Sequence, residues 1–318
     1  MAITTTTQMP AAVQQTLGRR LLSVKVPYLI HTVAADRTSL PRGGGRIKRF
    51  RRYTKLQTAT IPLGNTGVTP PAQVLSAVDI DALMQFYGTY VQINEQVPLQ
   101  TQEPVLNEAS KLLGISLRET EDELTRDMLA ATAVVQTCVN GVNGDVPTEL
   151  TSSDIALVVR QLLSNDAKSL MSMIEGQNKI GTGPIRNAYL ALGHSDLSAD
   201  LNQQNIAGFL HSSQYPSQSN LLEPEWGSVQ NLRYLLSSIG SKVPNGSGNG
   251  RDLYNVFCIG VEAYGCVYQD GYKDQLLYRP PIFDGPLALN FSLGYKFSYA
   301  SRIYNDAWII NNQCTLRV

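Results

Sequence analysis

The alternation of apolar and polar positions predicts strands in the first third of the chain. Residues 45–56 (GRIKRFRRYTKL) and 78–97 (VDIDALMQFYGTYVQINEQV) alternate as half-buried strands do. Between them, residues 61–71 (IPLGNTGVTPP) contain the glycines and prolines that interrupt a sheet ladder. We therefore expect two strands on either side of an irregular tip, forming an elongated hairpin that protrudes from the body.

The longest helical pattern covers residues 102–137. Its apolar side chains recur at spacings of four and seven, at Leu106, Leu113, Leu117, Leu124, Met128 and Val135. Acidic residues crowd its middle, at Glu119, Glu121, Asp122, Glu123 and Asp127. Consecutive helix positions point in different directions, so we interpret these acids as a solvated or interfacial face and not as catalytic carboxylates.

The second half of the chain is predicted to contain short helices followed by many strands. The expected elements are a turn-rich linker at 139–151, helices at 153–165 and 167–177, strands within 185–196 and 252–268, and a surface loop at 243–252. A side chain from Thr151 to Ser153 is expected to cap the first of these helices. Residues 287–318 alternate repeatedly and are rich in aromatic and β-branched side chains, which predicts strands up to the C-terminus.

Charge is low overall and unevenly distributed. Charged residues make up 16% of the chain, against about 25% in ordinary soluble domains, which suits a protein that covers its surface with copies of itself. Residues 1–55 contain eleven Lys or Arg against one acid, and the remainder contains 15 basic and 25 acidic residues. The basic end can therefore pair with the chain's own acidic body, with a neighbouring copy or with nucleic acid, or stay solvated without a partner.

Known patterns of reactive or metal-binding residues do not occur in the sequence. The four cysteines are far apart and form no CxxC pair, so we expect reduced, mostly buried thiols. His31, His194 and His211 lack a carboxylate or cysteine at ligand spacing, and neither HExxH nor GxSxG occurs. Each histidine is interpreted as exposed or internally satisfied. We therefore expect no enzyme activity, no cofactor and no metal site.

Neither a secretory signal nor a membrane span is expected. Residues 1–20 contain no apolar run after a basic start, and no window approaches the roughly 20 apolar residues that a spanning helix needs. The basic cluster at residues 46–55 has two interpretations. With Phe50 and Tyr53 interleaved, it could stack on bases and neutralise phosphates, or it could be a strand whose basic face meets an acidic neighbour.

Several segments, taken in order, resemble those of a known family. They are RIKRFRRYTKL, MQFYGTYVQINEQV, EPVLNEASKLLG leading into LRETEDELTRDML, GTGPIRNAYLALGHSDLSADL, EPEWGSVQNLRYL after Tyr215, IGVEAYG and LGYKFSYASRIYNDAWI. Together they span most of residues 40–310. The sequence resembles tailed-bacteriophage major capsid proteins of the Hong Kong 97-type fold, and more narrowly their enquatrovirus-type branch.

The resemblance implies an α+β fold with a specific division of the chain. The expected parts are an N-terminal arm at 1–40, an extended β-hairpin loop with adjoining strands at 41–100, a peripheral domain with a long spine helix at 101–150, an axial domain at 151–284, and return strands of the peripheral domain at 285–318. Such proteins form pentamers and hexamers that close an icosahedral shell, the capsid of the virion, around double-stranded DNA in the bacterial host cytoplasm. The resemblance implies no cofactor, no catalysis and no membrane.

Other partners follow from the resemblance or from charge. About 40 residues precede the loop, which implies a separate scaffolding protein in place of a fused one; a portal and a decoration protein are further expected partners. We also expect the basic strand of one subunit to meet the spine helix of the next. This hypothetical interface comprises Arg46, Lys48, Arg49, Arg51, Arg52, Lys55, Glu119, Glu121, Asp122, Glu123 and Asp127. Arg19, Arg20 and Lys25 are expected arm contacts. The alternative function is a nucleic-acid-binding protein that uses a basic arm.

Overall fold

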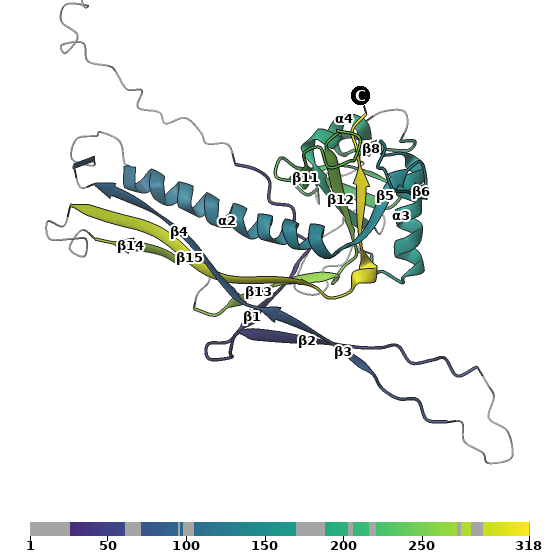
Figure 1. Ribbon diagram of the computed structural model, residues 1–318, viewed down its shortest axis with the longest axis horizontal. Helices are drawn as coiled ribbons and strands as arrows, with labels where there is room; N and C mark the ends of the chain where they lie inside the picture. The colour runs from purple at the N-terminus through teal and green to yellow at the C-terminus, as the bar shows by residue number, and fades with distance from the viewer. Residues whose placement is uncertain are drawn as a thin grey trace, which may run out of the picture.

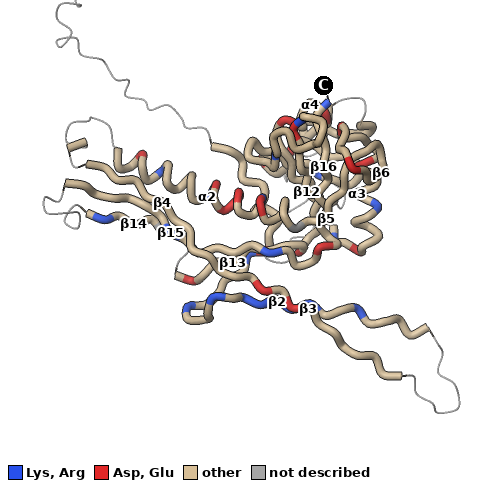
Figure 2. Tube along the Cα trace, in the orientation of Figure 1, with Lys and Arg blue, Asp and Glu red and all other residues tan. Residues whose placement is uncertain are grey.

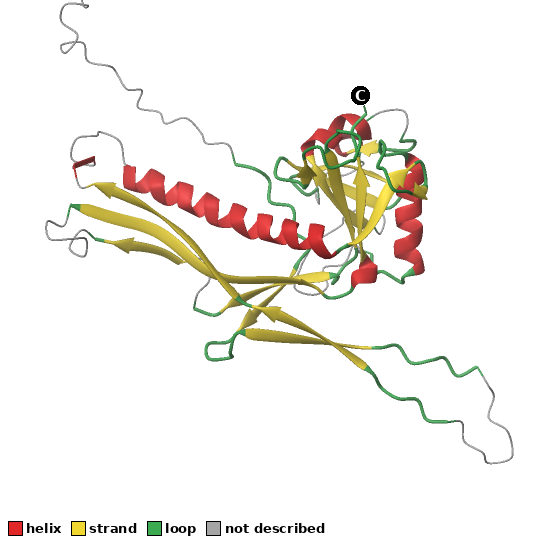
Figure 3. Cartoon of the chain, viewed as in Figure 1, coloured by secondary structure: helices red, strands yellow, loops and turns green. Residues whose placement is uncertain are grey.

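The protein consists of two lobes and a hairpin that extends away from both, as the computed structural model shows (Figure 1). The structure describes residues 26–60, 71–94, 96–97, 105–169, 188–202, 206–215, 221–271, 275–280 and 289–317. Helices and strands contribute to both lobes (Figure 3). This arrangement confirms the expected α+β class.

The elongated lobe is a long helix lying along a twisted sheet. The helix is α2 (Val105–Thr132), and the described strands of the sheet are β1 (Asp36–Leu40), β4 (Gln85–Asn94), β13 (Tyr264–Gln269), β14 (Gln275–Arg279) and β15 (Asn290–Ile303). Strand β15 pairs with β4 on one side and with β14 and then β13 on the other. Alternate β15 residues, among them Tyr295 and Phe297, are buried together with Leu113 and Leu117 of α2. The predicted apolar stripe is therefore the face that α2 packs on the sheet.

The helix is shorter at its C-terminal end than the sequence pattern predicts. Val135, the last member of the predicted stripe, lies in strand β5 (Val134–Val139), which begins two residues after α2 ends. The run VVQTCV is rich in β-branched side chains, which lose rotamer freedom in a helix and pack well in a sheet. Pairing with the C-terminal strand then fixes this segment as a strand.

The compact lobe is built on a mixed sheet whose described strands follow the order β6-β5-β16-β12-β7-β10-β9-β8, with β11 beside β12. Its strands are β5, β6 (Val142–Asn143), β7 (Tyr189–His194), β8 (Leu210–His211), β9 (Glu225–Val229), β10 (Leu232–Ser237), β11 (Lys242–Val243), β12 (Leu253–Ile259) and β16 (Ile309–Cys314). Helix α3 (Ser152–Ser164) buries Ile155, Val158 and Leu162 against this sheet. Thr151 caps α3 in a capping box with Asp154, which confirms the predicted cap. The short helix α4 (Ser198–Leu201) completes the lobe.

The lobes do not follow the expected division along the chain. Strands β13 and β14 lie within residues 151–284, yet they belong to the sheet under α2. Strand β16 lies within residues 285–318, yet it pairs with β5 and β12 in the compact lobe. The sequence pattern identifies a strand but carries no signal for its distant partner, so these strands are assigned only by long-range pairing.

The expected arm is part of the body over its last third. Ile30, Ala34 and Ala35 are buried in the main core, and β1 pairs in parallel with β13. The prediction of an arm over all of residues 1–40 is therefore wrong for residues 30–40, because apolar side chains there complete the core. Residues 1–25, with Arg19, Arg20 and Lys25, lie outside the described residues, as does most of the helix expected at 167–177.

The predicted hairpin is confirmed for the strands next to the body, whereas residues 85–94 of its second predicted strand form β4 in the other sheet, and the expected tip at 61–71 lies almost entirely outside the described residues. Strands β2 (Ile47–Tyr53) and β3 (Ala77–Leu83) form a two-stranded antiparallel sheet. Phe50 packs on Tyr304 with ring centroids 4.6 Å apart, and Ala82 and Met84 are buried with Val267 and Ala300 of the elongated lobe. The root of the hairpin is therefore anchored in the body, and the rest extends from it (Figure 1).

Candidate functional site

The outward face of the hairpin carries two arginine–aspartate pairs, which we call the ladder. Arg49 donates to Asp81 through Nε at 2.7 Å and Nη2 at 2.9 Å, and Arg51 donates to Asp79 at 2.7 Å and 3.1 Å in the same way. Each arginine lies directly opposite its aspartate in the β2–β3 register. Figure 2 shows the basic positions of β2 beside the acidic positions of β3. Bidentate pairing of this kind fixes the planes of both groups.

The ladder changes the electrostatics of the basic strand. Hydrogen bonds from Arg49 and Arg51 lower the pKa of Asp81 and Asp79 respectively, so both carboxylates are charged at neutral pH. Arg49 and Arg51 lie on the same strand face, and Asp79 and Asp81 balance the charge of this face within the chain. The sequence pattern did not lead us to predict that Asp79 and Asp81 pair with these arginines. The signal was their spacing of two residues, which equals the spacing of Arg49 and Arg51 on the opposite strand.

The other basic residues of the segment are placed differently. Lys48 donates to the Ser39 carbonyl at 2.6 Å and Arg46 to the Met84 carbonyl at 3.2 Å, so both stabilise the root of the hairpin. Arg52 and Lys55 make no salt bridge with any residue that the structure describes. These two exposed residues are therefore the cations of the strand that a partner could use.

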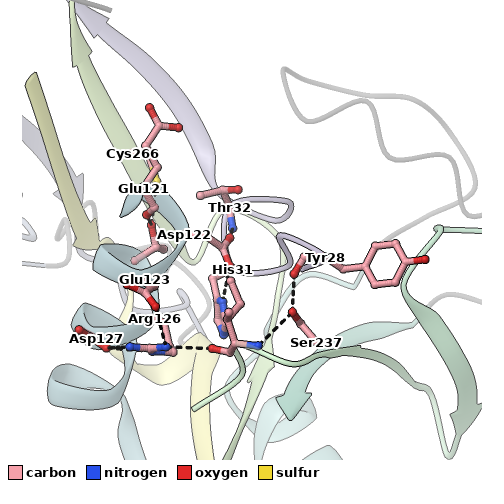
Figure 4. A network of polar contacts seen from close by, with 12 residues as sticks. Tyr28, His31, Thr32, Glu121, Asp122, Glu123, Arg126, Asp127, Ser237 and Cys266 are labelled. Atoms are coloured by element: carbon pink, nitrogen blue, oxygen red, sulfur yellow. Dashed lines mark hydrogen bonds and ion pairs between the residues drawn. The ribbon is translucent and has the colours of Figure 1, made fainter. Parts of the chain in front are cut away.

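The second candidate region is a buried polar junction between the lobes (Figure 4). His31 Nδ1 lies 2.7 Å from Asp122 Oδ2, and the Thr32 backbone N–H donates to Asp122 Oδ1 at 2.9 Å. The side chains of His31 and Asp122 are fully buried. The His31 ring also meets Phe257 of β12 edge-on, and its backbone carbonyl accepts a hydrogen bond from the Tyr264 hydroxyl at 2.5 Å. His31 is thus internally satisfied at Nδ1, by a carboxylate 91 residues away.

Further contacts connect the same junction to the compact lobe. The Ser237 hydroxyl at the end of β10 donates to the Tyr28 carbonyl. Arg126 of α2 donates to the Ile239 carbonyl at 3.0 Å, in the loop that follows β10. Figure 4 shows Tyr28, His31 and Thr32 between α2 and the strands of the compact lobe. The N-terminal segment is therefore in contact with both lobes at once.

The acids of α2 do not form one face. Asp122 is fully buried and Glu121 is 3% exposed, so the predicted role of these two in a subunit interface is wrong. They point inward because the helix turns them toward the core-facing side, where residues 31 and 32 supply donors to Asp122. Glu123 and Asp127 are exposed and lie 3.7 Å and 2.9 Å from Arg126, and Glu119 is half-buried. Of the five predicted acids, only Glu119, Glu123 and Asp127 are at least partly exposed, as a subunit interface requires.

A second buried ion pair lies in the compact lobe. Arg233 of β10 contacts Glu225 of β9 at 2.5 Å and 2.9 Å, and neither side chain is exposed. The Tyr215 hydroxyl also donates to Glu225, at 3.1 Å, and desolvation raises the pKa of Tyr215 to about 12. Buried charges of this kind need complete pairing. The pair was not predicted from the sequence, because neither residue belongs to a cluster of charged residues along the chain.

The remaining chemistry-bearing residues are structural. All four cysteines are free and buried, as expected. Burial raises the pKa of Cys258 to about 12, so its thiol is protonated. Among the described residues, no group of three or more His, Cys, Asp or Glu side chains is arranged to hold a metal ion. None of the described helices is long and apolar enough to cross a membrane.

Comparison with known proteins gives matches in structure alone. No protein-family model and no curated protein matches the sequence. The capsid of Ralstonia phage GP4 matches with a TM-score of 0.72 at 12% identity, over 96% of each chain. The head structure of Helicobacter pylori bacteriophage KHP40 matches with a TM-score of 0.64 at 10% identity, over 100% of this chain and 98% of that one. The chain has the Hong Kong 97-type phage capsid fold.

The likeness to this capsid fold covers both lobes and the hairpin. The capsid of a native GTA particle also matches over 99% of this chain and 100% of that chain, with a TM-score of 0.62 at 9% identity. The capsid fold expected from the sequence motifs is therefore confirmed.

Proposed function

We propose that this chain is the major capsid protein of a tailed bacteriophage, which assembles into pentamers and hexamers of an icosahedral shell around double-stranded DNA. The observation that carries the proposal is the match to the capsid of Ralstonia phage GP4 over 96% of both chains. The protruding hairpin supports it, because its exposed Ile47 and Tyr53 flank the ladder and lack a covering element within the described chain. The protein then resides in the virion after assembly in the bacterial cytoplasm, and its role is structural.

The finer parts of the proposal rest on the sequence motifs. We assign the chain to the enquatrovirus-type branch on the ordered segments from RIKRFRRYTKL to LGYKFSYASRIYNDAWI. In the capsid terms, α2 is the spine helix, the elongated lobe is the peripheral domain and the compact lobe is the axial domain. A separate scaffolding protein, a portal and a decoration protein are the proposed further partners.

We propose a revised contact between neighbouring subunits. The cations available on the hairpin are Arg52 and Lys55. On α2, the exposed Glu123 and Asp127 share the single cation Arg126 and so leave a net negative charge, and Glu119 on the same helix is half-buried. Opposite charges on two extended parts of the same chain favour head-to-tail contact between copies. The ladder weakens the alternative of a nucleic-acid-binding arm, because Asp81 and Asp79 already neutralise Arg49 and Arg51.

Negative-stain electron microscopy of the protein purified from a bacterial cytoplasm tests the proposal. We expect rings of five or six subunits or closed shells. A protein that stays monomeric at high concentration, and that binds duplex DNA with a steep dependence on salt, would overturn the capsid assignment in favour of the nucleic-acid-binding alternative.

A further inference from the structure

We infer that residues 28–35, which we call the strap, lock the angle between the two lobes and that release of the strap lets the lobes turn. The strap is the part of the N-terminal segment that lies between α2 and the compact lobe (Figure 4). The inference concerns the folded subunit. It rests on the proposed function only for its consequence, that the strap sets the shape with which each subunit enters the shell.

The strap joins the two lobes in addition to their covalent connections. The described chain crosses directly between the lobes from α2 to β5, from β12 to β13 and from β15 to β16. These crossings are covalent and permanent. The strap connects the same two lobes by side-chain and backbone contacts, at Asp122 of α2, Phe257 of β12 and Ser237 of β10. It is a connection that can open without breaking a strand or a helix.

Asp122 depends on the strap. The donors to its carboxylate among the described residues, His31 Nδ1–H and the Thr32 N–H, both come from the strap. A fully buried carboxylate that loses its donors carries a large desolvation penalty. Asp122 can therefore stay buried only while the strap is in place, and α2 must shift to hydrate this carboxylate when the strap leaves. Docking of the strap and seating of α2 are thus coupled.

The strap contacts form one unit. Ile30 is fully buried in a core that α2 and β15 share with β7, β10 and β12 of the compact lobe, so the strap cannot leave at His31 and stay at Ile30. The other charged groups nearby are Glu121 and Arg126 on α2 and Arg37 on the following strand, which donates weakly to the Thr32 carbonyl at 3.4 Å. Arg126 bonds Ile239 of the compact lobe, so its contact breaks as well if the lobes turn. We therefore expect two states, docked and released, with few intermediates.

The test compares two acids of the same helix on the unassembled subunit. Asp122→Ala removes the acceptor of the strap, whereas Glu119→Ala removes a half-buried acid three positions earlier on α2 and serves as the matched control. Spin labels at Lys111→Cys on α2 and Arg160→Cys on α3 report the distance between the lobes, because the native cysteines are buried. Hydrogen exchange of residues 30–35 reports docking of the strap.

We expect Asp122→Ala to accelerate exchange in the strap by roughly tenfold or more and to add a second distance to the label pair. Glu119→Ala should change neither. His31→Ala should reproduce the released state, whereas His31→Asn, whose amide can donate to Asp122 in place of Nδ1–H, should retain the single distance. Faster exchange in the strap with an unchanged distance would overturn the inference.

A third measurement covers the case in which Asp122→Ala does not fold. The label pair on the otherwise unsubstituted subunit is then followed in sub-denaturing urea. The distance must change over the same urea range in which strap amides lose protection, and a change at a different concentration would overturn the inference. Since every readout uses unassembled subunits, failure here leaves the capsid proposal standing, and failure to form shells leaves the strap testable.

Discussion

At the scale of single residues, Arg233 and Glu225 show how a buried charge depends on its partner. Both side chains of this bidentate contact are fully buried, and Tyr215 supplies a further hydrogen bond to Glu225. Glu225→Gln leaves the Arg233 guanidinium buried without a counter-charge. We expect the free energy of unfolding to fall by about 3–5 kcal/mol, measured by urea denaturation of the unassembled subunit.

The matched control for this prediction is an exposed ion pair. Glu108 contacts Lys111 at 2.7 Å on the solvent side of α2, and the lysine is 68% exposed. Glu108→Ala should change the free energy of unfolding by no more than about 1 kcal/mol. If both substitutions lowered the free energy of unfolding equally, burial of Arg233 would not be the reason for the large effect of Glu225→Gln.

His194 predicts a pH dependence of stability with a definite sign. Partial burial lowers the pKa of His194 below its ordinary value of 6.5, against an opposing effect of Asp196. The unfolded chain therefore takes up this proton at a higher pH than the folded chain does. The neutral His194 side chain therefore stabilises the folded subunit above about pH 6.5, and this contribution to the free energy of unfolding is lost as pH falls below that value.

The substitution His194→Asn tests this prediction. The His194 ring accepts a hydrogen bond from the Asp196 N–H at 3.1 Å, and an asparagine side chain retains such an acceptor without titrating. We expect the loss of stability between pH 7.5 and pH 5.5 to be smaller in His194→Asn than in the unsubstituted subunit. The same loss in both proteins would contradict the assignment to His194.

At the scale of elements, the ladder joins β2 and β3 by charged pairs across the hairpin. Arg49→Asp places a third acid beside Asp79 and Asp81, and like charges directly opposite each other destabilise a strand pair. We expect faster hydrogen exchange in residues 47–53 of this variant. Adding Asp81→Arg restores an opposite-charge pair in the reversed sense and should restore slow exchange.

The control for the ladder lies on the other face of the same strand. Arg52 is opposite Val78 and makes no salt bridge with a described residue, so Arg52→Asp should leave exchange at the hairpin nearly unchanged. The prediction would be contradicted if the double variant exchanged as fast as the single one, because the effect would then come from the loss of Arg49 and not from charge.

At the scale of the whole molecule, the revised subunit contact predicts a salt-sensitive assembly. Exposed charges further apart than about 8 Å are screened at physiological salt, so association of subunits should weaken as salt rises. Changing Glu123 and Asp127 to Lys should reduce assembly in sedimentation velocity experiments, and changing Arg52 and Lys55 to Glu in the same chain should partly restore it. Glu108→Lys, near the other end of α2, is the control and should assemble normally.

The elements of this protein were predictable where local chemistry is sufficient. The apolar stripe of α2, the Thr151 cap of α3 and the β2–β3 hairpin follow from periodicity, capping chemistry and turn residues, each of which acts over a few neighbouring positions. The ladder could also have been predicted from the sequence, because an antiparallel register can place two arginines and two aspartates of equal spacing opposite each other. The capsid fold was predicted from ordered motifs, and structural comparison confirmed it.

Only the tertiary structure decided the contacts between distant segments. The sequence presents Asp122 as one of several acids in a helix, and its burial depends on His31 and Thr32, about 90 residues earlier. Likewise, nothing in the strand pattern of residues 309–314 selects β5 and β12 as partners, or directs β13 and β14 to the other lobe. Local periodicity determines which face of an element is apolar, but the partner that covers this face is chosen by the packing of the whole chain.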